Sequence, residues 1–120
     1  MKVIKMSQVP EVDGSGPLFT GAVTRQPLVT EDMGHSFNMS NINFGRGVRN
    51  KFHTHSGDQV LLVTAGTGIV ATEREQRTVT VGELIFIPAG EKHWHGATKR
   101  SRFSHISLTQ AGSQTQQLEQ

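Results

Sequence analysis

Short strand-like segments separated by glycine- and proline-containing turns run along most of the chain, and no stretch shows the 3.6-residue period of a helix. Polar and apolar residues alternate over 36–44, whereas 59–65 and 83–89 are apolar on both faces. Further strands are expected at 66–73, 77–81 and 102–109. This pattern predicts an all-β fold, either a sandwich or a small barrel.

At 120 residues the chain is long enough for one domain with its own core. Strands that are apolar on both faces need cover on the outer side of their sheet as well. In so small a chain a partner subunit is the expected cover, which predicts a homodimer or a higher homo-oligomer. The tail at 110–120 is rich in glutamine and poor in apolar residues, so we expect it to be mobile or to form a short loose helix.

Composition excludes several classes of protein and site. The chain has no cysteine, so any metal must be held by His, Gln, Asn or carboxylate side chains. Its 12 basic and 10 acidic residues are too evenly balanced to indicate nucleic-acid binding, and the basic run at 99–102 is expected to be a solvated turn. No apolar run suits a signal peptide or a membrane span, which together with the lack of cysteine predicts a cytoplasmic protein.

Histidines cluster in a way that favours metal binding over an isolated structural role. The six are His35, His53, His55, His93, His95 and His105. Positions i and i+2 of a strand point the same way, so His53 and His55 form one pair, and His93 and His95 form another. Neutral imidazole is the commonest metal ligand in proteins. A metal site is therefore expected, with His35 left as a surface residue.

Spacing around these pairs is more specific. The chain has Gly47, five residues, His53-x-His55, three residues, Gln59, six residues and a glycine, and later a glycine, five residues, Pro88-x-Gly90, two residues and His93. These spacings resemble the two signature motifs of the cupin superfamily, and the resemblance covers roughly residues 17–109. It implies a double-stranded β-helix, a jelly-roll barrel of two antiparallel sheets. Residues 1–16 would be an N-terminal arm available to pair with a partner subunit.

The cupin resemblance also implies that His53, His55, Gln59 and His93 hold one divalent metal inside the barrel. Family members usually carry Glu where Gln59 stands, and often Asn where Ala97 stands. A neutral Gln leaves the full charge of the ion uncompensated, which favours Lewis-acid chemistry over oxygen activation. The alternative is that Gln59 only caps the preceding turn and the metal has three ligands.

Four segments, "HTH" with the following Gln, "VTAGTG", "PAGEKHWHGAT" and "FSHISL", resemble a narrower group. This is the group of cupins associated with carboxymuconolactone decarboxylases, which includes manganese-dependent bacterial hydroxynitrile lyases. The resemblance implies Mn(II), with Fe(II), Ni(II) or Zn(II) as alternatives. It also implies that His105 is a general base and that His95 lines the same pocket. An ordinary histidine pKa of about 6.5 would suit proton transfer near neutrality.

Alternation along the strands, with the face of Ser40, Ile42 and Phe44 inward as the resemblance to the lyase-containing group implies, predicts a mostly apolar substrate pocket. Its expected residues are Ser40, Ile42, Phe44, Leu61, Val63, Phe103, Ser107 and Thr109. Such a pocket suits a small hydroxy or carbonyl compound, and the first hypothesis is a metal-dependent lyase or decarboxylase-like enzyme. The alternatives are a non-catalytic small-molecule-binding or sensor protein, and a sugar or uronate isomerase or a dioxygenase. Trp94 faces away from its neighbouring histidines and is expected to pack between sheets or subunits.

Overall fold

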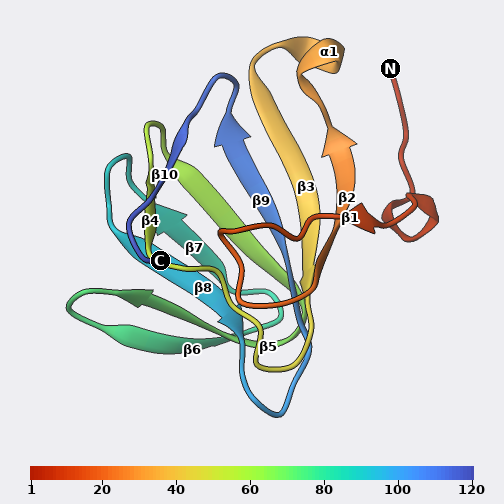
Figure 1. Cartoon of the computed structure of the whole chain (residues 1–120). Coiled ribbons are helices and arrows are strands. Elements are labelled where there is room, and N and C mark those ends of the chain that lie inside the picture. The colour runs from red at the N-terminus through yellow and green to blue at the C-terminus, as the bar shows by residue number, and fades with distance from the viewer.

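Ten antiparallel strands form one continuous array that curls on itself, and the computed structural model describes residues 1–120 (Figure 1). They are β1 (Val12–Asp13), β2 (Val23–Val29), β3 (Phe37–Phe44), β4 (His53–His55), β5 (Gln59–Thr72), β6 (Gln76–Thr80), β7 (Leu84–Ile87), β8 (His93–Ala97), β9 (Phe103–Gln110) and β10 (Thr115–Gln117). Besides these there are a 3-10 turn at Met6–Gln8 and a short helix, α1 (Glu31–Gly34). No helix has the length and hydrophobicity needed to cross a membrane. The predicted all-β jelly-roll fold is confirmed.

The long strand β5 belongs to two sheets. Its first half pairs with β7 and β9, and its second half pairs with β6 and β8. Between them the register shifts, and Gly66 adopts a φ of +71° where an added Cβ would lie 1.8 Å from the Arg102 carbonyl oxygen. The sequence predicted two strands, at 59–65 and 66–73. The chain instead keeps one strand, because a bulge bends it without ending its pairing.

Four other predicted strands, at 36–44, 77–81, 83–89 and 102–109, correspond to β3, β6, β7 and β9. The tail differs from expectation. Residues 115–117 are extended and pair antiparallel with β4, and Glu119 forms an ion pair with Arg49 at 2.6 Å. A loose helix was the wrong expectation here, because backbone pairing at a sheet edge does not need apolar side chains.

The N-terminal arm lies against its own barrel. Val12–Asp13 pair with β2 of the same chain, and the Gln26 amide donates to the carbonyl oxygens of Met6 and Val9. These residues use one hydrogen-bonding edge for β2, and pairing of the arm with a partner subunit stays a prediction.

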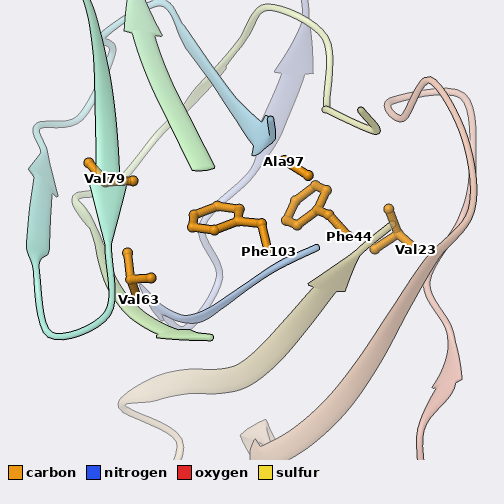
Figure 2. Close-up of a cluster of buried hydrophobic side chains, with 6 residues drawn as sticks. All are labelled: Val23, Phe44, Val63, Val79, Ala97 and Phe103. Atoms are coloured by element: carbon orange, nitrogen blue, oxygen red, sulfur yellow. The ribbon is translucent and has the colours of Figure 1, made fainter. Parts of the chain in front are cut away.

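Six buried side chains from six strands form the apolar core (Figure 2). They are Val23, Phe44, Val63, Val79, Ala97 and Phe103. The Phe44 and Phe103 rings lie 5.9 Å apart, and Gly68 passes so close to the Phe103 ring that an added Cβ would lie 2.5 Å from it. The Phe44 ring also contacts His105, with the ring centres 5.5 Å apart. The core therefore borders the histidines of the barrel interior directly.

Candidate metal centre

Three histidines from two neighbouring strands meet in the barrel interior. His53 of β4 pairs directly with His93 of β8, and His55 points the same way as His53. The ring centres of His53 and His93 are 4.3 Å apart, and those of His53 and His55 are 4.8 Å apart. One nitrogen from each ring lies within 4.8 Å of the other two, a separation at which one metal ion could contact all three. These residues are called the histidine triad below.

Backbone carbonyl groups set the protonation of two triad members. The Nδ1 atom of His53 lies 2.6 Å from the Lys51 carbonyl oxygen, and Nδ1 of His93 lies 2.8 Å from the Glu91 carbonyl oxygen. A carbonyl oxygen only accepts, so each neutral ring carries its proton on Nδ1 and leaves a lone pair on Nε2. This arrangement is typical of metal-binding histidines.

His55 is held by a side chain of the C-terminal strand. Its Nδ1 atom lies 2.9 Å from the Thr115 hydroxyl oxygen, which can accept the ring proton. The Nε2 atoms of His53 and His55 are both buried without a hydrogen-bond partner. Because an unpartnered buried acceptor is costly, these atoms fit a site that receives a ligand.

Gln59 begins β5 and directs its amide toward the triad. The amide nitrogen donates to the Ser107 hydroxyl at 2.9 Å, which places the amide oxygen 3.3 Å from Nε2 of His93. Gln59 is 5% exposed, and its side-chain hydrogen bonds go to Ser107 and His93 and not to the turn at 56–58. The amide oxygen is thus available to a metal beside the triad, whereas the turn-capping role is absent.

Burial keeps the triad neutral. Loss of hydration, together with the smaller effect of the nearby His93, lowers the pKa of His53 to about 3 and that of His55 to about 4. Burial also lowers the pKa of His93. Neutral imidazole is the form that binds metal, so all three rings are ready to act as ligands near neutral pH.

The other two interior histidines bond to each other. His105 Nε2 lies 2.9 Å from His95 Nδ1, and the Asn50 amide nitrogen lies 3.1 Å from His95 Nε2. The Asn50 amide oxygen accepts from the His95 backbone N–H at 2.8 Å, which fixes the amide orientation. Asn50 therefore donates to His95 Nε2, so His95 carries its proton on Nδ1 and donates to His105. We call His95 and His105 the histidine pair.

The environment of His105 differs from the expectation. Burial lowers its pKa to about 4, because the ring is fully buried and packs 5.4 Å from the Phe103 ring. The value of about 6.5 expected from the residue type alone is wrong. The pKa of His95 is also well below its usual value, mainly through burial and then through the neighbouring His105. The pair is uncharged near neutral pH.

The expected pocket residues fall into two groups. Ser40, Ile42, Ser107 and Thr109 line a cavity of about 260 Å³ that also includes Arg25, Asn38 and Met39. The other four are no more than 2% exposed and belong to the packed interior; they are Phe44, Leu61, Val63 and Phe103. The open part of the pocket is therefore more polar than the sequence suggested.

Two further residues lie away from this interior. His35 is exposed, as expected, and adopts a φ of +63° at the end of α1. Trp94 points to the opposite side of β8 from the triad, where the Arg49 guanidinium lies 4.6 Å from its ring centre. Neither residue contacts the metal centre.

Three residues that the sequence did not single out contact these groups or the cavity beside them. Asn50 bonds to His95, Thr115 bonds to His55, and Arg25 lines the cavity with Ser107. For Arg25 a signal was present, since it stands between Val23 and Pro27 at the two-residue period of a strand. For Asn50 and Thr115 no local pattern marks the role.

Comparisons with known proteins agree with this geometry. Residues 42–108 match the cupin domain family. An (R)-mandelonitrile lyase from Granulicella tundricola is 33% identical over 101 residues, which are 82% of this chain and 77% of that protein. A cupin-like protein from Thermotoga maritima superposes with a TM-score of 0.83 at 30% identity, covering 89% of this chain and 84% of that one. The polyketide cyclase RemF from Streptomyces resistomycificus superposes with a TM-score of 0.89 at 18% identity, covering 100% of this chain and 87% of that one. At this identity the likeness shows the fold alone.

Proposed function

This chain belongs to the cupin family, and on that premise we propose that it is a metal-dependent enzyme with lyase activity on a small hydroxy or carbonyl compound. The ligands would be Nε2 of the three triad histidines and the amide oxygen of Gln59, holding one divalent ion, with Mn(II) favoured. The observation that carries the proposal is the anchoring of each triad Nδ1, which leaves Nε2 for a ligand.

A divalent ion supplies Lewis acidity when it is bound at such a site. The proposed ligands contribute no negative charge, because the triad is neutral and Gln59 is an amide. Anionic groups would therefore be attracted to the centre more strongly than if a Glu stood at position 59. This charge balance supports non-oxidative chemistry.

The histidine pair would accept the proton that such a reaction removes from the substrate. The His95 ring centre lies 5.7 Å from those of both His53 and His93, so the pair adjoins the triad. Both rings are neutral near pH 7, and Asn50 orients His95 toward His105. The substrate proton would enter at His95 Nε2 in place of the Asn50 hydrogen bond, and the 2.9 Å contact with His105 would stabilise the resulting positive charge.

The proposal includes a second copy of the chain on the outer face of β5 and β7. Leu62 and Leu84 lie directly opposite each other there, and Phe86 lies on the same face two residues further along β7. All three are exposed. A Leu84→Asp variant should be monomeric in sedimentation, whereas a wild-type monomer at micromolar concentration would contradict a dimer.

The test uses mandelonitrile, because a relative carries that activity. Protein stripped of metal and reloaded with Mn(II) should release benzaldehyde, and His53→Ala should lose both the metal and the activity. A metal-loaded wild type that is inert toward mandelonitrile would remove hydroxynitrile lyase activity. Equal metal content in wild type and His53→Ala would remove the site itself.

A further inference from the structure

Arg25 stands on the inward face of β2. It shares that face with Val23, which is 2% exposed and part of the core. Across the sheet, Arg25 pairs with Ile42, and Ile42 pairs with His105. Residues directly opposite each other on paired strands point to the same side, so Arg25 lies on the same sheet face as His105, with its side chain exposed to solvent.

The cavity described above is lined by Arg25 and by a residue that contacts a proposed metal ligand. Arg25 and Ser107 are both part of its lining. Ser107 in turn accepts the hydrogen bond of the Gln59 amide at 2.9 Å. A ligand in this cavity could therefore reach both Arg25 and Ser107, and Ser107 is hydrogen-bonded to the proposed metal ligand Gln59.

The Arg25 guanidinium has no partner within the chain. The three ion pairs are formed by Arg49, Arg77 and Lys92. The nearby Asp13 carboxylate instead accepts the Ser15 backbone N–H at 2.9 Å. An arginine offers a planar set of donors that matches a carboxylate, and this one remains available for a ligand.

We propose that Arg25 binds a carboxylate of the substrate, at the end remote from the atoms that react. This inference rests on the proposed function and narrows it to small hydroxy or carbonyl compounds that are also carboxylic acids. Two strand spacings, about 10 Å, separate the backbones of Arg25 and His105, so the carboxylate and the reacting group stand on different carbons. A neutral compound such as mandelonitrile leaves Arg25 unpaired.

A matched pair of ligands tests this. Levulinate carries a ketone and a distant carboxylate, and methyl levulinate is its neutral ester. Calorimetric titration of Mn(II)-loaded protein should show levulinate bound about tenfold more tightly than the ester, which is typical of one hydrogen-bonded charge. Arg25→Gln should bring the ratio to about one, and Arg25→Lys should keep part of the preference. Added salt should weaken the preference of the wild type for levulinate over the ester.

Arg100→Gln is the control, because this substitution removes the same charge at a different place. Arg100 is exposed in the loop between β8 and β9. It should keep the wild-type ratio. An equal preference in wild type and in folded Arg25→Gln would overturn the inference, as would failure of wild type to bind levulinate at all. Metal content and titrations of metal-free protein separate the two claims. If wild type holds no metal but still prefers levulinate through Arg25, the proposed function is wrong and the Arg25 inference stands.

Discussion

The histidine triad and the histidine pair lie side by side in one barrel, yet they use their ring nitrogens differently. In the triad each Nδ1 contacts a backbone carbonyl or a hydroxyl, and the Nε2 atoms of His53 and His55 are buried without a partner. In the pair the rings bond to each other and Asn50 fixes the direction of the chain of hydrogen bonds, which leaves Nδ1 of His105 as the one ring nitrogen of the pair without a partner. The first arrangement prepares nitrogens for an external ligand, whereas the second prepares a path for a proton.

The two groups can be compared directly on β8, because this strand carries His93 of the triad and, two residues later, His95 of the pair. His93→Ala should lower Mn(II) affinity by more than about 100-fold, since changes in outer hydrogen-bond partners alone cost up to that much. His95→Ala should change affinity only a few-fold, because both of its nitrogens have other partners. Competition titration with a metal indicator measures both. Similar losses of Mn(II) affinity in the two variants would contradict the distinction between triad and pair.

The histidine pair should affect the rate of the reaction and leave metal binding intact. His105→Ala should keep its Mn(II) but lower kcat for any active substrate by about 100-fold or more, the usual contribution of a positioned proton acceptor. Initial rates on samples with equal measured metal content test this. An unchanged kcat would take the pair out of the proposed reaction.

The anchors of the triad should have a smaller effect than its members. Thr115→Val removes the hydroxyl that holds His55 while keeping the shape of the side chain. We expect about a tenfold loss of Mn(II) affinity. Thr115→Ser keeps the hydroxyl and should match wild type. Equal affinity in all three proteins would show that β10 does not support the site.

Acid should destabilise the metal-free protein through both groups. The folded-state pKa is about 3 for His53 and about 4 for His55 and His105, below the value of 6.5 for an unfolded histidine. The unfolded chain then binds more protons, so stability is full above about pH 6.5 and falls as the pH drops toward 5. Calorimetric Tm values between pH 8 and pH 5 should decline by several degrees. The exposed His35→Gln variant should show the same decline, and a flat profile would contradict burial of neutral rings.

Much of the fold and of the triad follows from local patterns in the sequence. Two-residue alternation marks β3 and β9, and the spacing of His53, His55 and His93 marks the triad. The supporting contacts depend on which distant strands become neighbours. Thr115 reaches His55 only because β10 pairs with β4.

Burial is the other quantity that sequence patterns left out. The pKa of His105 is set by its packing against Phe44 and Phe103, and these rings come from β3 and β9. Likewise, Arg25 faces the cavity only because β2 pairs with β3 in this register. Neither property can be assigned from the residue type.

Anomalous diffraction from crystals of Mn(II)-loaded protein tests the central claim most directly. We predict one peak about 2.2 Å from Nε2 of each triad histidine and from the amide oxygen of Gln59. The histidine pair should keep its mutual hydrogen bond in the same crystal. A peak bound to His95 or His105, or no peak at saturating Mn(II), would contradict the division between a metal-binding triad and a proton-accepting pair.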